Sequence, residues 1–493
     1  MSPHGKRYIL GWINVTHVCP RWRSIALNMA SFWARDVCNV PEARDVVVRR
    51  ARNFPLKLQM GHHFYPGELY ASMHRFIVEH IPSARDIDVM LREGYLKRLL
   101  DGLVDAGDLS KLEALSVKRP ADGRFERCLH SAIVAPRLRT CVLGDCFVPL
   151  NALHLTHLDL SRNIDAYEQS RMGVSVQRVL HTLRTTPRLQ RLRISDYFSY
   201  SEGVEGQVVN LQELQELSIF SHPSHCITFL KNISFPPSLR LRVGFYIAPR
   251  YMTNKSVQAS ILPYFRDLFS LLSPLLDLSS PSHSHVPTAL SVAMTPTWNF
   301  HVNVLAPSTS PRQPSFIPFF TDYRSLFDAN HHSALHLAII NWIPPSDAVL
   351  EICTLLSEDF GTAGTVKKLE MSYQVHGEEH WKRMTALWPD VEEFYMSGYC
   401  CDQEGVSEAL KPQIANGMAD MRWKRLRLWR LAPQICQNGN DAEGNVDAVA
   451  TALEMRAEHG MKLPEFETSH ENMKNIRTRL ECAATTVNFV ESH

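Results

Sequence analysis

Hydrophobic residues recur along the chain in a six-residue pattern, L-x-x-L-x-L, in which apolar residues hold the first, fourth and sixth places. Apolar and polar side chains alternate over the last part of this pattern, and such alternation predicts a short β-strand with one buried face. Eight copies occur in two groups, and their starts lie 17 to 34 residues apart within each group. They are LEALSV at 112–117, LRTCVL at 138–143, LTHLDL at 155–160, LQRLRI at 189–194, LQELSI at 214–219, VKKLEM at 366–371, VEEFYM at 391–396 and WKRLRL at 423–428.

The segments between the copies have helical patterns. Residues 174–184, 347–356 and 381–387 carry apolar side chains at helical spacing, and Pro187 follows the first of them. Alternating strands and helices predict an α/β fold with a parallel sheet. The stretch HLTHLDLSRN at 154–163 is similar to a leucine-rich repeat, with Asn163 near the place of the repeat's asparagine. We therefore predict an irregular leucine-rich-repeat-like solenoid, in which helices cover a curved parallel sheet.

The pattern weakens between the two groups. Residues 279–285 (SSPSHSH) and 306–314 (APSTSPRQP) are rich in Ser and Pro and predict loops, whereas 299–305 and 334–340 alternate like strands. From residue 437 a polar loop precedes two predicted helices near 446–459 and 471–482. We expect three parts: a helical module at 1–40, the solenoid at 41–436 and a helical C-terminal cap at 437–493.

Residues 10–36 (LGWINVTHVCPRWRSIALNMASFWARD) have apolar side chains at spacings of three and four, which is one face of a helix. Because proline is tolerated in the first turn but not inside a helix, we expect two short helices that meet near Cys19 and Pro20. Ser31 is a capping residue type and predicts a third short helix with Phe32 and Trp33. Three short helices with two buried tryptophans bury little surface alone, so this module should dock on a larger body or a partner.

The same segment resembles the second half of an F-box. Its Val18-Cys19-Pro20-Arg21-Trp22-Arg23, Ala26-Leu27 and Ser31-Phe32-Trp33 are similar to V-C-R-x-W-R, A-L and S-L-W, and Gly11-Trp12-Ile13 with Val15-Thr16-His17 is similar to the F-box-like family of mushroom-forming fungi. The resemblance implies that this module binds the Skp adaptor of a cullin–RING ubiquitin ligase and that the rest of the chain selects a protein substrate. It assigns an F-box core or adaptor-binding role to Val15, Val18, Cys19, Trp22, Ile25, Ala26 and Trp33.

The resemblance reaches Met60 if residues 42–60 are included, because a short helix and a strand follow the box in this family. An F-box normally opens with a helix of the type L-P-x-E-I-L-x-x-I-F. Residues 1–9 (MSPHGKRYI) contain no such sequence. We therefore expect the first F-box helix to be missing, either because the box is degenerate or because its true start lies upstream of Met1.

The composition narrows the class of partner and the compartment. Among 493 residues, 52 Lys and Arg stand against 51 Asp and Glu, a balance that favours neither nucleic acid nor a membrane as partner. The 11 cysteines never form C-x-x-C and predict reduced thiols in the cytoplasm or nucleus. Polar residues interrupt 9–18, which excludes a signal peptide, and the longest apolar stretch, 268–278, is too short for a bilayer.

Three groups of residues have the side-chain types of a metal site. His376 and His380 match the inverted zinc-peptidase motif H-x-x-E-H, but Gly377 weakens the helix that this chemistry needs. His332 and His336 are four residues apart, but the predicted strand at 334–340 would separate them. The third group, without zinc-finger spacing, is Cys141, Cys146, His154 and His157. We therefore predict a non-enzymatic protein with no catalytic residues, no metal and no cofactor.

The basic run at 421–430 (MRWKRLRLWR) is typical of a nucleic-acid or acidic-peptide surface, but it also fits a repeat strand with Leu426 and Leu428 inward. In a solenoid the outward strand positions line the concave face and are candidates for substrate contact. They are His157, Asp159, Arg191, Arg193, Lys368, Glu370, Glu393, Tyr395, Arg425 and Arg427. The sequence thus favours an F-box-like substrate receptor, and the alternative is a leucine-rich-repeat scaffold that no longer binds the adaptor.

Overall fold

The computed structural model describes residues 17–61, 67–119, 131–162, 173–199, 208–236, 239–246, 262–272, 289–295, 299–305, 333–340, 346–359, 366–372, 377–396, 403–415, 418–420, 422–431, 442–468 and 477–489. The chain divides into two compact units, Met1–Ser221 with Thr228–Pro236 and His222–Ile227 with Pro237–His493. This division does not coincide with the three parts expected from the sequence. The predicted loops at 279–285 and 306–314 lie outside the described residues.

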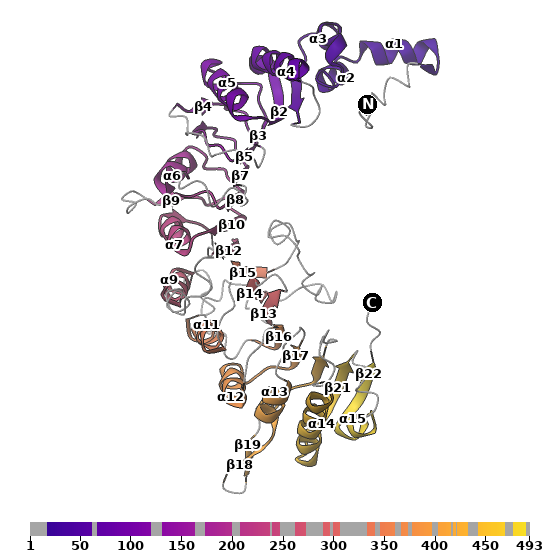
Figure 1. The fold of residues 1–493 in the computed structure, drawn as a ribbon, viewed down its shortest axis with the longest axis vertical. Helices are drawn as coiled ribbons and strands as arrows, with labels where there is room; N and C mark the ends of the chain where they lie inside the picture. The colour runs from indigo at the N-terminus through magenta and orange to yellow at the C-terminus, as the bar shows by residue number, and fades with distance from the viewer. Residues whose placement is uncertain are drawn as a thin grey trace. The chain divides into compact units, whose positions relative to one another are not determined.

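Unit 1 starts with helices and continues as alternating strands and helices (Figure 1). Its helices are α1 (Pro20–Asn28), α2 (Ala30–Arg35), η2 (Pro41–Ala43), α3 (Arg44–Ala51), α4 (Gly67–His80), η3 (Ile81–Ser83), α5 (Glu93–Asp105) and α6 (Val176–Arg184). Its strands are β1 (Leu56–Met60), β2 (Ala84–Met90), β3 (Ala114–Lys118), β4 (Ile133–Val134), β5 (Thr140–Gly144), β6 (Leu150–Asn151), β7 (His157–Ser161), β8 (Arg191–Ser195), β9 (Val209–Asn210), β10 (Glu216–Ser221) and β11 (Ile233–Ser234). Helix α7 (Pro223–Lys231) has residues in both units.

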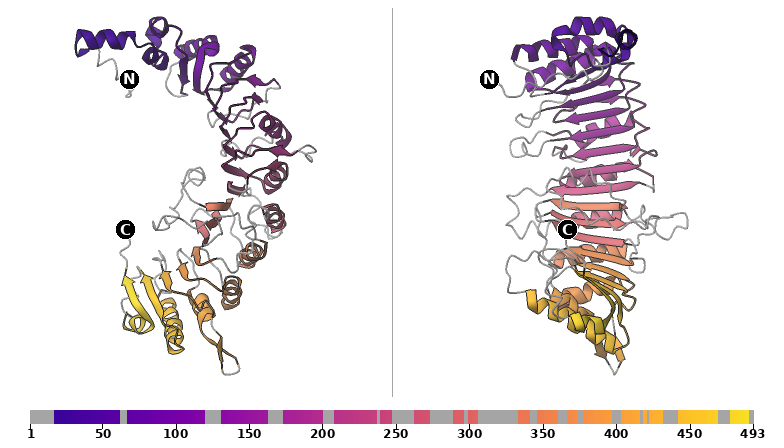
Figure 2. Two further views of the ribbon diagram at one scale, coloured as in Figure 1. Left: turned by 180° about the vertical axis from the view of Figure 1, so that it is seen from behind. Right: turned by 90° about the vertical axis from the view of Figure 1, so that its right-hand side faces the viewer.

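The main sheet of unit 1 is parallel throughout the described strands. Its order is β1-β2-β3-β5-β7-β8-β10, and each of these neighbouring pairs is parallel. Figure 2 shows these strands side by side, and Figure 1 shows α5 and α6 on one face of them. The prediction of an α/β fold with a parallel sheet is therefore confirmed.

The repeated hydrophobic pattern explains these strands. The first apolar residue of each copy is buried just before its strand, as in Leu112, Leu138 and Leu155. From the second to the fifth copy, the second residue donates its backbone N–H to the carbonyl of the second residue of the copy before, with Arg139 N to Glu113 O at 2.8 Å and Thr156 N to Arg139 O at 2.9 Å. The inward residues then alternate with outward ones, so β7 buries Leu158 and Leu160.

Unit 2 also combines helices with strands. Its described helices, besides its part of α7, are α9 (Leu262–Leu272), α11 (Ser346–Asp359), α12 (Glu378–Leu387), α13 (Gln403–Leu410), α14 (Ala442–Glu458) and α15 (Arg477–Ala483). Its described strands are β12 (Arg240–Tyr246), β13 (Ala289–Thr295), β14 (Asn299–Leu305), β15 (Ser333–Ile340), β16 (Lys368–Ser372), β17 (Glu393–Met396), β18 (Gln413–Ala415), β19 (Met418–Asp420), β20 (Leu428–Leu431), β21 (Leu463–Thr468) and β22 (Ala484–Phe489).

The sheet of unit 2 is mixed. Its order is β12-β15-β14-β13-β16-β17-β20-β21-β22, and β14 runs antiparallel to both β13 and β15. The predicted strands at 299–305 and 334–340 are present as β14 and β15, whereas the sequence pattern does not predict β13. The C-terminal part is not purely helical as expected, because β21 and β22 follow α14 and α15 and extend the sheet in parallel.

The sequence pattern places the last copy, WKRLRL, three residues too early. The strand β20 starts at Leu428, and Trp429 pairs in register with Phe394 of β17. The backbone N–H of Arg427 donates to Glu392 O at 2.7 Å, which gives Arg427 the second place of the pattern. The copy is therefore LRLWRL at 426–431, with the buried Trp429 in its fourth place. The side chain of Leu428, which is predicted to point inward, lies outside the described part.

Candidate protein-binding surfaces

Helix α1 begins where the sequence predicts. Cys19 is extended, with φ −159°, and Pro20 holds the first helical position, where its missing N–H costs no hydrogen bond. The helix ends as Met29 donates its N–H to Ala26 O at 3.2 Å, and the Asn28 side chain donates to Ser24 O at 2.9 Å. The result is a short helix of nine residues whose side chains, apart from Ala26, are largely open to solvent.

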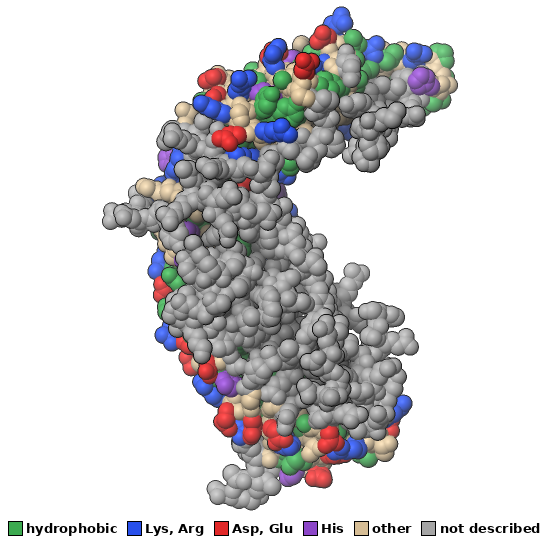
Figure 3. Space-filling model, in the orientation of Figure 1, with side chains coloured by type: hydrophobic (Ala, Val, Ile, Leu, Met, Phe, Trp, Pro, Cys, Tyr) green, Lys and Arg blue, Asp and Glu red, His purple; other side chains and the backbone are tan. Residues whose placement is uncertain are grey.

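One side of α1 and its flanks is both apolar and exposed. Val18, Trp22, Ile25 and Met29 are 69%, 52%, 46% and 37% exposed, at spacings of four, three and four. Trp22 and Ile25 share one face of α1, and Val18 and Met29 flank the helix at its two ends. We call these four residues the α1 patch. Figure 3, in the orientation of Figure 1, shows hydrophobic and basic side chains together at the end of unit 1 that holds α1.

Helix α2 anchors the module through Trp33. This tryptophan is 5% exposed, its Nε1 donates to Leu27 O at 3.1 Å, and the Arg50 guanidinium lies 4.6 Å from its ring centroid. The helix starts at Ala30 without a side-chain cap, so the prediction that Ser31 caps it is wrong. The prediction of two buried tryptophans is also wrong, since Trp22 is half exposed.

The seven residues assigned by the F-box resemblance do not form one buried group. Ala26 and Trp33 face the protein, Cys19 is half-buried, and Val15 lies outside the described residues. The other three, Val18, Trp22 and Ile25, belong to the α1 patch. The structure thus separates a packing side of the module from an outward side.

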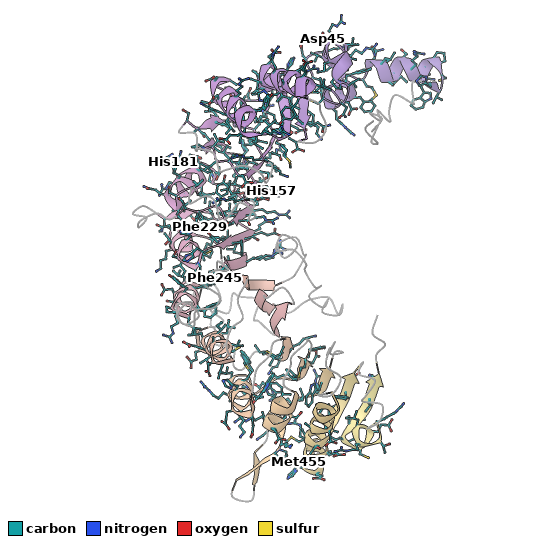
Figure 4. The ribbon with its side chains drawn as sticks, viewed as in Figure 1. Asp45, His157, His181, Phe229, Phe245 and Met455 are labelled. Atoms are coloured by element: carbon teal, nitrogen blue, oxygen red, sulfur yellow. The ribbon has the colours of Figure 1, made fainter. Side chains whose placement is uncertain are left out.

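On unit 1 the structure brings four predicted surface residues together. His157 of β7 pairs in register with Arg191 of β8, and Asp159 pairs with Arg193. The Arg191 guanidinium also lies 3.4 Å from the Glu216 carboxylate on β10. Burial, and then the positive charge of Arg191, lower the pKa of His157. Figure 4 shows His157 on the strand side of unit 1 and His181 on the helix side.

A second group lies on unit 2. The Lys368 ammonium is 3.3 Å from the Glu393 carboxylate and 4.3 Å from the centroid of the Tyr395 ring, and the Tyr395 hydroxyl donates to Glu393 at 3.1 Å. Glu370 pairs in register with Tyr395, but its side chain lies outside the described part. These three described side chains satisfy one another across two neighbouring strands.

Two of the predicted surface residues are not on a strand. Arg425 and Arg427 precede β20, where Arg425 lies 3.6 Å from the Asp390 carboxylate and Arg427 lies 2.7 Å from that of Glu392. This corrects the expectation that both point outward from a strand. The ten predicted positions therefore fall into two groups, one in each unit, with Arg191 ion-paired in the first and Lys368, Glu393, Arg425 and Arg427 ion-paired in the second.

The residues with metal-ligand side-chain types have other contacts where the structure describes them. His380 Nε2 lies 2.8 Å from Asp347 Oδ1, and the Glu379 carboxylate lies 3.1 Å from the Lys382 ammonium. His332 and His376 lie outside the described residues. Cys141 is fully buried, which raises the pKa of its thiol. Among the described residues, no group of three or more His, Cys, Asp and Glu side chains is placed to hold a metal ion.

A row of buried charges at the strand ends was missed by the sequence analysis. Arg119, Asp145, Arg162 and Asp196 directly follow β3, β5, β7 and β8 and are each at most 7% exposed. Backbone bonds continue the ladder through this row, with Asp145 N to Ser161 O and Arg162 N to Ser195 O both at 2.9 Å. The signal was the charged residue two places after each of the first four copies of the pattern, in VKR, LGD, LSR and ISD.

Two aspartates of this row adopt an unusual backbone conformation. Asp145 and Asp196 have φ of 56° and 49°, a left-handed region that aspartate tolerates better than most residues. Burial raises the pKa of Asp196 to about 7, although the positive charge of Arg162 lowers it, and Asp145 raises it further. Its Oδ2 is buried with no hydrogen-bond partner among the described residues.

These features define an α/β protein with an extended, largely parallel sheet and an exposed apolar helix face. No protein-family model matches the chain, and a search of curated proteins finds no relative. Within the described part, no helix is long and apolar enough to cross a lipid bilayer.

Proposed function

We propose that this chain is a non-enzymatic protein-interaction module of the F-box-like type. In this proposal the α1 patch docks on a Skp-type adaptor of a cullin–RING ubiquitin ligase. The strand positions of an irregular leucine-rich-repeat-like solenoid then contact the protein to be ubiquitylated, in the cytoplasm or nucleus.

The observation that carries the proposal is the exposed α1 patch. Six of the nine large hydrophobic side chains that stand exposed in the described part lie between residues 18 and 54. Monomeric proteins seldom gather apolar side chains at one exposed place unless it contacts a partner. Removing the four side chains of the patch fully from water would contribute roughly 8–10 kcal/mol at 25 cal/mol per Å², before the costs of association. The α1 patch therefore favours a protein partner with an apolar groove in which these side chains can be buried.

The repeat pattern supports the second half of the proposal. In unit 1, seven described strands stand in parallel and in chain order, which presents their outward positions on one face. This face carries side chains of both signs, and Arg191 of β8 is ion-paired with Glu216 of β10. A substrate on this face would contact both positive and negative side chains, so shape and hydrogen bonding would decide recognition more than net charge.

Binding of the full chain to a purified Skp-type adaptor from a mushroom-forming fungus tests the proposal. Trp22→Ala should weaken binding about 30-fold or more, since a central tryptophan is worth at least about 2 kcal/mol. The control is Leu153→Ala, which truncates an exposed apolar side chain outside the α1 patch (56% exposed) and should leave the affinity unchanged. Both variants should keep the thermal midpoint of the parent chain, because neither side chain is buried.

Absence of binding by the unmodified chain would sink the proposal. A partner complex that forms and is insensitive to Trp22→Ala would instead favour the leucine-rich-repeat scaffold.

A further inference from the structure

The α1 patch has a cationic border on one flank only. An α-helix turns about 100° per residue, so Arg21 lies next to Ile25 on the helix surface, and Asn28 lies on the same flank as Arg21. The Arg52 guanidinium reaches this flank from the end of α3, where its Nη2 donates to the Asn28 side chain at 3.4 Å. Arg21 and Arg52 therefore stand along one side of the patch, at its two ends.

The other flank of the patch is different. Arg23 lies about 100° from Trp22 in the opposite direction, on the side where Ala26 is buried against the protein. All three arginines are exposed. Arg21 and Arg23 are thus two arginines directly before and after Trp22 in the sequence. They lie on opposite sides of the same apolar face.

The surrounding segment is basic, unlike the chain as a whole. Residues 17–61 contain eight Arg and Lys and three Asp and Glu, against 52 and 51 in the full chain. Helix α1 has no acidic residue in its first turn. A charge excess confined to the segment that bears the apolar patch favours a partner of opposite charge at this place.

We propose that Arg21 and Arg52 are specificity determinants of the α1 patch, which selects a protein groove with an apolar floor and carboxylates along one rim. This rests on the proposed function, because the groove is that of the adaptor. The asymmetry favours a protein groove over an anionic membrane, since a flat surface would engage arginines on both flanks alike.

The test compares charge reversal on the two flanks. Affinity of the full chain for the purified adaptor is measured at about 0.1 M salt, where screening acts over about 10 Å, and again at high salt. The double variant Arg21→Glu with Arg52→Glu should bind about tenfold more weakly at the lower salt, and its deficit should shrink at high salt. Arg23→Glu, the matched control, should stay within about twofold of the parent chain.

Two results would overturn the inference. One is an equal loss of affinity in Arg23→Glu and in the double variant, and the other is an unchanged affinity in the double variant. In either case, loss of binding in Trp22→Ala would leave the proposed function standing. A third result would overturn both proposals. In it the parent chain does not bind the adaptor but binds vesicles that contain phosphatidylserine, and charge reversal on either flank weakens this vesicle binding equally.

Discussion

The buried Arg456 of α14 offers a sharp test of how unit 2 is held together. Its guanidinium is 2% exposed and donates to three backbone carbonyls, Arg422 O at 2.8 Å, Trp423 O at 3.0 Å and Leu410 O at 3.5 Å. These carbonyls belong to the end of α13 and to the turn before β20, in which Trp423 has a positive φ of 48°. The side chain thus joins α14 to α13 and to the turn before β20.

Two opposing effects set the change in the free energy of unfolding when Arg456 is replaced. Each carbonyl left buried without a donor costs roughly 1–3 kcal/mol, and the bond at 3.5 Å contributes least. Against this, burial of the charge is unfavourable, and it lowers the pKa of Arg456 to about 10. Arg456→Met removes the bonds and also the cost of burying the charge, so it should lower the free energy of unfolding by about 2 kcal/mol. Arg456→Lys keeps a buried charge but cannot reach all three carbonyls, and should cost about 3 kcal/mol.

Urea unfolding followed by tryptophan fluorescence measures both effects, because Trp423 and Trp388 lie in the affected region, where Trp423 Nε1 donates to Trp388 O at 2.8 Å. The control is Arg477→Met, which breaks an exposed i,i+4 pair with Glu481 and should change stability by less than about 0.5 kcal/mol. If Arg456→Met proved as stable as the parent chain, or more stable than Arg477→Met, the carbonyl bonds would not outweigh the cost of burying the guanidinium.

Two further predictions concern unit 1. The pKa of Asp196 is about 7 in the folded state and near 3.8 in the unfolded state, so between these values the folded state binds a proton that the unfolded state has lost. The free energy of unfolding should therefore fall as pH rises from about 4 to 7 and then level off. Asp196→Asn should remove this slope, and urea midpoints across that range check it; an identical slope in both proteins would refute the reasoning. Gly173→Ala should cost about 3 kcal/mol, because a Cβ there would lie 2.5 Å from backbone atoms of Phe198 and Ser199. Gly94→Ala in α5 meets no atom within 4 Å and should gain about 0.5 kcal/mol, so equal thermal midpoints for the two variants would contradict the difference in their surroundings.

The strands were largely predictable from the sequence because each copy of the pattern carries its own signal. An apolar first residue and alternating apolar residues after it specify a strand with one buried face, and β3, β5, β7, β8 and β10 follow it. The last copy failed for a definite reason. Trp423, Leu426 and Trp429 are all buried at spacings of three, so two overlapping copies compete, and only the backbone bond from Arg427 to Glu392 selects between them.

The surfaces were less predictable than the strands. Helical spacing shows that one side of α1 is apolar, but it does not tell whether that side is covered, and Trp22 and Trp33 look alike in sequence. Only the fold shows that Trp33 packs while Trp22 stands open. Likewise, the pairing of Lys368 with Glu393 depends on the register of two strands 25 residues apart, which no local pattern contains.

The buried charge row adds information that the hydrophobic pattern lacks. A slip of one strand by one residue is strongly disfavoured, because it moves every apolar side chain to the outer face. A slip by two residues keeps the apolar face inward, so alternation alone penalises it little. Such a slip would move Arg162 out of line with Asp145 and Asp196, and so would remove the positive charge that lowers the pKa of the buried Asp196. The alternation of sign along Arg119, Asp145, Arg162 and Asp196 therefore favours one register among those that the leucines permit.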